Sequence, residues 1–360
     1  MPTEPKMIDT NDLLPPPIEG PSAWYGPDIT NSTDWIYELG VGEVAEIEAV
    51  MKPLAEQEIE ISSITQNDFS LPTLGQKLLA IRDDVTKGRG FALMRGLPVD
   101  HWSIHESATA YFGIGTHLGN VVSQNAMGHF LGHVRDVGRD VVNDPTARLY
   151  QTNNRQRYHT DRTDVVGLLC LRTAKTGGSS SLVSSMTIYN EMYKRAPDLL
   201  RELFELFPID HRGEVGPDKK GYAMSPIYSW HRGFLSAFYT RSYIDSSRRF
   251  ADLPPIGGAR LAALDMVDEL ANDPTINLHM DFKPGDMQWV YNHTSMHDRT
   301  AYEDWPEEHR KRHLLRLWLS IPGDRPLPET YRYRWGKIEA GDRGGVHVPN
   351  GKLITPLKAS

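Results

Sequence analysis

Cysteine and long apolar runs are nearly absent from this chain, and both absences narrow what it can be. Cys170 is the single cysteine among 360 residues, so neither an intrachain disulfide nor a cluster of thiolate metal ligands can form within one chain. Residues 1–17 are polar and proline-rich where a signal peptide needs an apolar core. No stretch approaches the roughly 20 apolar residues of a membrane span. We therefore expect a soluble, cytoplasmic protein that does not bind membranes.

Motifs for nucleotides and nucleic acids are also missing. Neither the glycine-rich dinucleotide fingerprint nor a P-loop occurs in the sequence. The formal net charge is -8 and the pI is near 6.0, and the one notable basic run is the short segment 309–313. These features argue against nicotinamide chemistry and against a nucleic-acid surface, so the expected partner is a small molecule.

Length and patterning indicate one elaborated domain that follows an N-terminal arm. Residues 1–30 contain a triple proline and scattered small polar residues, which is typical of an extended arm that packs on the body or on a neighbouring subunit. A homo-oligomer is therefore compatible with the sequence. The chain is 39% hydrophobic and can bury a full core, and we assign residues 31–360 to a single domain.

Hydrophobic periodicity predicts short strands, with helices before and between them. Helical spacing occurs over residues 74–87, 103–117, 188–194, 199–207 and 261–270, and strand patterns occur over 91–94, 165–171, 181–185, 276–282, 287–291 and 312–321. Alternating βαβ units are not evident. The pattern predicts a mainly β fold with flanking helices, built on a β-sandwich or jelly-roll core.

One pattern offers a complete set of ligands for a metal. His159 and Asp161 are two residues apart, and His297 lies far downstream. Two imidazoles and one carboxylate are the facial triad of non-haem Fe(II) oxygenases, which leaves positions on the iron open for a chelating co-substrate and O2. Composition alone gives about two His-x-Asp/Glu matches by chance, and a second match begins at His279. Only the first is far enough from His297 for most of a jelly roll to lie between them.

The strand predicted over residues 312–321 carries two arginines on one face. Alternation places Arg312 and Arg316 on the side shared with Leu314 and Trp318. Both faces are partly apolar, which predicts a buried strand, and a buried guanidinium is costly unless an anion meets it. A guanidinium pairs bidentately with a carboxylate, so a metal-chelating dicarboxylate is a natural ligand. The alternative is an edge strand whose arginines are solvated or paired with acidic residues.

Five motifs stand in a fixed order within residues 75–335, and they are His159-Thr160-Asp161, Gly177-Gly178-Ser179-Ser180, Gly285-Asp286-Met287-Gln288, Asn292 ahead of Met296-His297-Asp298-Arg299, and the segment 312–318. This order resembles the taurine dioxygenase (TauD/TfdA) family of Fe(II)- and 2-oxoglutarate-dependent oxygenases. The resemblance implies a double-stranded β-helix as the jelly-roll core. It also implies an iron ion bound by His159, Asp161 and His297.

The resemblance further implies a site for the co-substrate 2-oxoglutarate. Its distal carboxylate is expected on Arg312, with the Ser180 hydroxyl donating to the same group. Arg316 then faces the acidic group of the prime substrate. The interval between His297 and Arg312 is longer than in taurine-type members, which leaves open that Arg316 binds the co-substrate instead.

Other polar residues are candidates for substrate contacts. Gln124 and Asn125 are such candidates, with a role in a turn as the alternative. Arg155, Arg157 and Arg162 flank the first motif and either contact an anion or remain solvated loop charges.

The expected reaction is oxidation, in its usual form hydroxylation, of an unactivated C–H bond in a small acidic substrate such as an amino acid, organic acid or sulfonate. O2 is consumed, and succinate and CO2 are released. Two alternatives stand beside it. A jelly-roll isomerase or hydrolase would use the same triad as a Lewis acid without O2, and a non-enzymatic protein would only bind small anions.

Overall fold

The computed structural model describes residues 14–141, 143–144, 146–214, 220–346 and 352–359. The first thirteen residues of the predicted arm lie outside these ranges. Residues 14–24 form neither helix nor strand and run along helix α5 (Ser185–Arg195). The Asn190 side chain hydrogen bonds to the backbone N–H and carbonyl of Ile18, at 2.7 and 2.8 Å. The short helix α1 (Gly26–Thr30) ends the arm.

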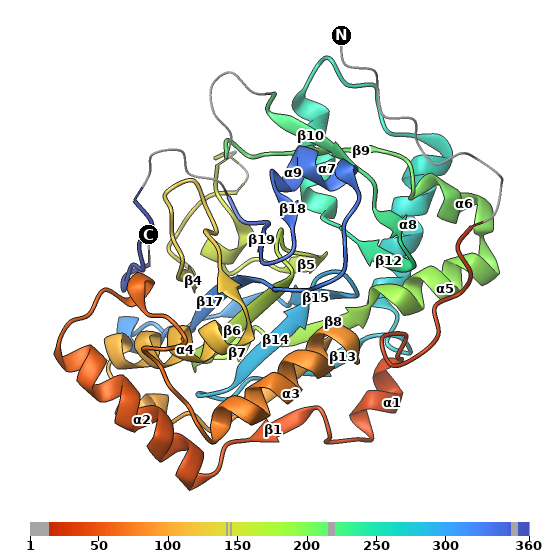
Figure 1. The fold of residues 1–360 in the computed structure, drawn as a ribbon. Coiled ribbons are helices and arrows are strands. Elements are labelled where there is room, and N and C mark those ends of the chain that lie inside the picture. The colour runs from red at the N-terminus through yellow and green to blue at the C-terminus, as the bar shows by residue number, and fades with distance from the viewer. Residues whose placement is uncertain (1–13, 142, 145, 215–219, 347–351, 360) are drawn as a thin grey trace.

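Two sheets form the centre of the molecule (Figure 1). The larger has the order β1-β2-β14-β6-β17-β3, with β4 also paired to β17, and the smaller has the order β13-β8-β15-β5. The strands of the larger sheet are β1 (Ile36–Glu38), β2 (Phe91–Arg95), β14 (Met287–Tyr291), β6 (Val165–Arg172), β17 (His313–Ser320), β3 (Asn120–Val121) and β4 (Gly132–Val134), and those of the smaller are β13 (Leu278–Met280), β8 (Ser180–Ser184), β15 (Ser295–Arg299) and β5 (Gln156–His159). Strands β5, β6 and β8 alternate between the two sheets, and so do β13, β14, β15 and β17, whereas β8 and β13 are paired neighbours in the smaller sheet.

Helices α2 (Val41–Glu56), α3 (Leu74–Lys87) and α4 (Ile104–Leu118) pack together beside the larger sheet (Figure 1). The buried face of α3 carries Leu74, Leu78, Ile81 and Val85, and these join a core with Leu315, Leu317 and Leu319 of β17. The other face of β17 carries Arg316, and Arg312 directly precedes the strand and lines the same cavity as Arg316. Ser103 caps α4, because its hydroxyl accepts from the Glu106 N–H at 3.1 Å while Glu106 accepts from the Ser103 N–H at 2.7 Å.

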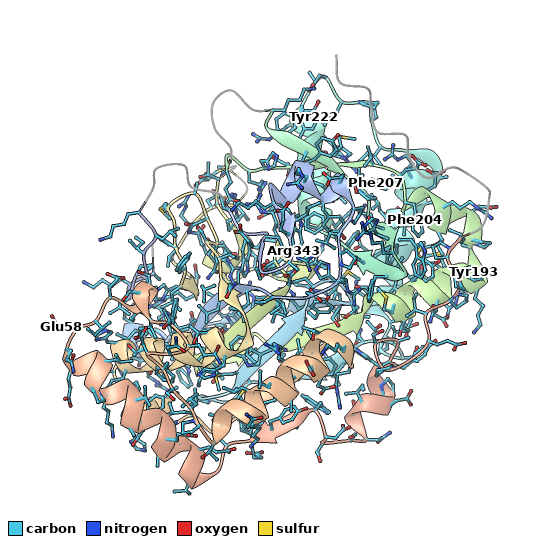
Figure 2. All side chains as sticks on the ribbon, in the orientation of Figure 1. Glu58, Tyr193, Phe204, Phe207, Tyr222 and Arg343 are labelled. Carbon is cyan, nitrogen blue, oxygen red and sulfur yellow. The ribbon has the colours of Figure 1, made fainter. Side chains whose placement is uncertain are left out.

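A second core lies over the smaller sheet. It is formed by α5, α6 (Pro197–Glu202), α7 (Arg241–Ser246), α8 (Gly258–Asn272) and α9 (Arg332–Trp335), with the hairpins β9 (Phe207–Asp210) to β10 (Tyr222–Ser225) and β11 (Tyr228–His231) to β12 (Phe234–Ala237). Figure 2 shows Phe204 and Phe207 in this region, whereas Glu58 lies at the outer edge of the molecule. Two short pairs complete the strands, β7 (Thr176–Gly177) with β16 (Tyr302–Glu303) and β18 (Ile338–Glu339) with β19 (Asp342–Arg343).

The predicted elements match this architecture with one clear error. The helix expected over residues 199–207 ends at Glu202, and Phe207 instead begins strand β9. Pro208 explains the difference, because the residue before a proline is disfavoured in the helical region. No helix in the described ranges is long and apolar enough to cross a membrane.

Arg343 holds three distant segments together in the interior (Figure 2). Its Nε donates to Asp164 Oδ1 at 2.7 Å and its Nη2 donates to Asp324 Oδ2 at 2.8 Å. Asp164 also accepts from the Ile321 N–H at 2.8 Å and lies 2.8 Å from His293 Nε2. Arg343 and Asp164 are fully buried, so each charge depends on its partners for compensation.

Arg343→Met should therefore lower the free energy of unfolding by about 3–5 kcal/mol, because two buried carboxylates lose their countercharge. Urea denaturation measures the change. Arg201→Met is the control, because Arg201 and its partner Asp198 are both largely exposed and such a pair contributes at most about 1 kcal/mol. Equal losses in the two variants would contradict this account.

Candidate active site

Strand pairing brings the three predicted metal ligands together. β5 and β15 are antiparallel neighbours, with His159 directly opposite His297, and the centroids of the two imidazole rings are 4.1 Å apart. Asp161 follows the end of β5. Its Oδ1 lies 3.9 Å from His159 Nε2 and its Oδ2 lies 3.8 Å from His297 Nε2. Three donor atoms thus converge on one point, as a facial set of metal ligands requires.

Neighbouring groups fix the orientation of these ligands. His159 Nδ1 lies 2.9 Å from the Arg157 carbonyl, so an Nδ1–H donates there and the lone pair of the ring is on Nε2, the atom that would bind a metal. Gln156 Nε2 lies 2.9 Å from His159 Nε2 and donates to it, so a metal would take the place of this hydrogen bond. Trp318 Nε1 donates to Asp161 Oδ2 at 2.9 Å. The Asp161 backbone N–H donates to Asn292 Oδ1 at 2.8 Å, which ties the ligand loop to the turn before β15.

The ionisation of the ligands suits a divalent cation. Burial, with His159 adding to it, lowers the pKa of His297 to about 3, which keeps this imidazole neutral. Burial alone would raise the pKa of Asp161, but Arg316, the two imidazoles and Trp318 outweigh it and lower that pKa below its usual value. A neutral imidazole at His297 and a carboxylate at Asp161 are the forms that bind a metal, so these residues, with His159 Nε2 beside them, fit Fe(II).

Two other sets of possible metal ligands lack the properties of a metal site. His279 is exposed on β13, where it pairs with Ser181, and it belongs to neither of the possible ligand groups in the described ranges. Asp164, His293 and Asp324 also lie close together. The Arg343 guanidinium fills the space between their carboxylates, which makes this group part of the scaffold.

A small cavity extends from the imidazoles toward Arg312. It has a volume of about 30 Å³ and is lined by His159, His297, Ser180 and Arg312, among others. The Arg312 side chain is 4% exposed, and its Nη1 has no hydrogen-bond partner within the described part of the chain. Burial lowers the pKa of Arg312. A buried, unsatisfied guanidinium beside a hydroxyl is a fitting receptor for a carboxylate.

Arg316 lies nearer to the triad. Its Nη1 is 3.8 Å from Asp161 Oδ2, and its Nε donates to Gln124 Oε1 at 2.7 Å. Gln124 Nε2 in turn donates to the Arg316 carbonyl at 2.7 Å, so the Gln124 side chain orients the arginine. Asn125 has the turn role, because its Oδ1 accepts from the backbone N–H groups of Met127 and His129 at 3.0 and 3.2 Å.

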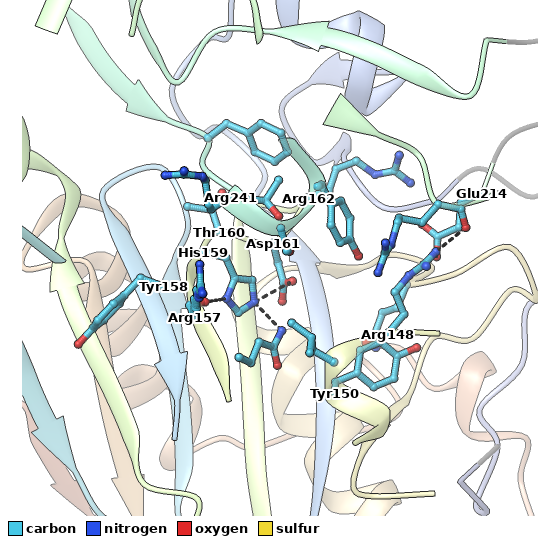
Figure 3. Close-up of a pocket in the computed structure, with 18 of the residues that line it drawn as sticks. Arg148, Tyr150, Arg157, Tyr158, His159, Thr160, Asp161, Arg162, Glu214 and Arg241 are labelled. Atoms are coloured by element: carbon cyan, nitrogen blue, oxygen red, sulfur yellow. Dashed lines mark hydrogen bonds and ion pairs between the residues drawn. The ribbon is translucent and has the colours of Figure 1, made fainter. Parts of the chain in front are cut away.

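A larger cavity opens on the other side of the triad, and Figure 3 shows it with His159 and Asp161 at its centre. Its volume is about 410 Å³. Gln124, His159, Asp161 and Trp318 line it together with a set of arginines, which are Arg148, Arg155, Arg157, Arg162, Arg212, Arg241, Arg316 and Arg334. Asn125 is not among the described residues of its lining.

Sequence analysis identified Arg155, Arg157, Arg162 and Arg316 as candidate contacts, but it did not identify the other arginines of this cavity. Arg162 is buried, whereas Arg157 is exposed. Arg155 is paired with Asp298 at 2.9 Å. Arg148, Arg212 and Arg334 come from segments without any motif, so no local pattern identifies them.

Comparison with known proteins agrees with this geometry. The family model described as taurine catabolism dioxygenase TauD, TfdA family matches residues 51–318. FR-33289 synthase of Streptomyces rubellomurinus is 32% identical over 90% of this chain and 97% of its own length. A taurine hydroxylase-like protein of Stachybotrys chartarum is 27% identical over 82% of this chain and 77% of its own length.

A solved structure has the same fold. Asparagine oxygenase in complex with Fe(II), 2S,3S-3-hydroxyasparagine and succinate superimposes with a TM-score of 0.62 at 17% identity, over 79% of this chain and 93% of that one. The predicted jelly-roll core is thereby confirmed. The chain belongs to the TauD/TfdA family and is an Fe(II)- and 2-oxoglutarate-dependent dioxygenase.

Proposed function

We propose that this enzyme hydroxylates an unactivated C–H bond in a small acidic molecule, such as an amino acid, organic acid or sulfonate, with release of succinate and CO2. One observation carries the proposal. The triad stands between two cavities, a small one that ends at Arg312 and Ser180 and a larger one of about 410 Å³ lined by arginines. The guanidinium and hydroxyl at the end of the first suit the carboxylate of a chelating dicarboxylate, and the second cavity suits an acidic substrate.

His159, Asp161 and His297 would hold the iron. When bound, Fe(II) supplies the redox chemistry that couples O2 to the decarboxylation of 2-oxoglutarate. The chain contributes orientation, because the Arg157 carbonyl and Trp318 fix two of the ligands. It also excludes bulk water, since Asp161 and His297 are 8% and 9% exposed.

Arg312 and Ser180 would bind the distal carboxylate of 2-oxoglutarate. Support comes from the unsatisfied Arg312 Nη1 and from the cavity that both residues share with the imidazoles. Arg316 would contact the prime substrate near the iron, held in place by Gln124. We assign Asn125 no substrate contact, because its side chain is engaged in its own turn.

The names of two similar proteins are consistent with a small acidic substrate. One mentions taurine and the other mentions 3-hydroxyasparagine. We also place the enzyme in the cytoplasm, with a small molecule as its only required partner. The single cysteine supports that location, and burial raises the pKa of the Cys170 thiol to about 12, which makes it unreactive.

Anaerobic loading of the enzyme with Fe(II) and 2-oxoglutarate should give the metal-to-ligand charge-transfer absorption of the ternary complex and, on exposure to O2, succinate. His159→Ala and Asp161→Ala should abolish the absorption band, because each removes a ligand. His279→Ala is the matched control and should keep it. A wild-type enzyme that makes no succinate would refute the proposed function, and a band that survives Asp161→Ala would remove that residue from the site.

Arg312→Gln should weaken 2-oxoglutarate binding at least tenfold, because a charge-assisted hydrogen bond contributes about 1.5–3 kcal/mol. Titration of the charge-transfer band measures this affinity. Arg310→Gln serves as the control, since Arg310 is exposed on the same segment. If Arg316→Gln cost more affinity for 2-oxoglutarate than Arg312→Gln, the co-substrate anchor would be Arg316.

A further inference from the structure

Four arginines gather in the part of the larger cavity that the proposed roles of the triad and Arg316 leave unused. They are Arg148, Arg162, Arg212 and Arg334, which we call the distal arginine group. Arg148 precedes the turn at residues 149–151, Arg162 follows Asp161, Arg212 follows β9, and Arg334 lies on α9. Arg148, Arg162 and Arg334 are only 7%, 7% and 5% exposed. Figure 3 shows Arg148 beside Glu214, away from His159.

Aromatic packing holds three of these side chains around one ring. The guanidinium carbons of Arg148, Arg212 and Arg334 lie 5.9, 5.5 and 5.8 Å from the centroid of the Tyr243 ring. Arg162 joins them, because its Nη1 donates to the Arg334 carbonyl at 3.0 Å. Charges of one sign are therefore fixed close together, in a place where water screens them poorly.

The distal arginine group carries more positive charge than its surroundings balance. In the described ranges its one salt bridge is from Arg148 to Glu214, at 3.0 Å. The remaining hydrogen bonds of these guanidinium groups go to neutral acceptors, which are the carbonyls of Thr146, Ala147, Arg212 and Arg334 and the His211 ring. The nearby Asp210 is already engaged by both Nε and Nη2 of Arg249. Four cations thus face one carboxylate.

Arg241, on the rim of the same cavity, provides the contrast. It contacts Asp245, Asp265 and Asp268 at 3.2, 2.8 and 2.9 Å. The positive charge of Arg241, which has a structural role, is therefore balanced by neighbouring carboxylates. In the distal arginine group, the buried Nε atoms of Arg212 and Arg334 have no hydrogen-bond partner within the part of the chain that the structure describes. A buried surplus of cations with free donors indicates an anion as ligand.

The number of guanidinium groups favours a doubly charged tetrahedral anion. A planar carboxylate offers two oxygens and one charge, and a single bidentate arginine satisfies it. A phosphate or phosphonate group offers three terminal oxygens and nearly two charges. It can therefore accept from several guanidinium groups at once, and those of the distal arginine group come from four separate segments of the chain.

We propose that the distal arginine group binds a phosphate or phosphonate group of the prime substrate and so holds the carbon to be oxidised near the triad. This inference rests on the proposed function and narrows its substrate class. The cavity joins both ends, because His159 and Asp161 line it together with Arg162 and Arg334. With a volume of about 410 Å³, it accommodates a small organic molecule between the two.

Binding of simple anions to the metal-free enzyme tests the inference without turnover. Calorimetric titrations would use methylphosphonate, methyl phosphate, methanesulfonate and acetate at about pH 8.5, where the phosphorus groups carry two charges. We expect methylphosphonate or methyl phosphate to bind at least tenfold more tightly than the two monoanions. Preference for one of the two phosphorus compounds would assign the site to phosphonates or to phosphate esters. Binding of neither, or equal binding of methanesulfonate, would overturn the inference.

Variants locate the binding. Arg162→Gln and Arg334→Gln should each weaken the preferred phosphorus anion at least tenfold, because each removes a charge-assisted contact. Arg332→Gln is the matched control, since Arg332 lies on the same helix but is exposed and bound to Glu329 and Glu339. Unchanged affinity in Arg334→Gln, with its fold verified by an intact charge-transfer band with Fe(II) and 2-oxoglutarate, would place the anion elsewhere. That band and succinate formation report on the proposed function independently.

Discussion

The antiparallel pairing of β5 with β15 is the constraint on which the rest of the site depends. It sets His159 opposite His297, and a slip of one residue in either strand would turn one imidazole to the other face of the sheet. The register is secured from both sides. β15 pairs along its whole length with β8, and Asn292 binds the Asp161 backbone just before β15 begins. The jelly roll therefore brings together three ligands from two segments that are far apart in the chain.

Some buried arginines of this protein are paired with carboxylates and stabilise the fold, whereas others have no such partner in the described part of the chain and line the candidate site. Arg343 is fully buried and has two carboxylate partners, so its charge stabilises the fold. Arg312 is nearly as buried, yet its Nη1 lacks a hydrogen-bond partner in the described ranges. The distal arginine group likewise carries more positive charge than the neighbouring carboxylate balances. Such groups cost stability in the free protein, and a bound anion compensates them, which links ligand binding to the energetics of the fold.

Much of the site could be predicted from the sequence because its ligands carry local signals. In the structure His159, Asp161 and His297 converge as their spacing predicts, and the strand expected over residues 312–321 forms as β17. Family membership argues against the alternative of a metalloenzyme that works without O2. Other features had no local signal. Arg148, Arg212 and Arg334 meet only through tertiary packing, and the strand at Phe207 depended on the proline after it.

An anaerobic crystal structure with Fe(II) and 2-oxoglutarate would show directly which residues bind the iron and the co-substrate. We expect one iron ion bound by His159 Nε2, His297 Nε2 and a carboxylate oxygen of Asp161, with the distal carboxylate of 2-oxoglutarate on Arg312 and Ser180. Iron bound by Asp164, His293 and Asp324 would refute this assignment. So would 2-oxoglutarate with its distal carboxylate in the larger cavity.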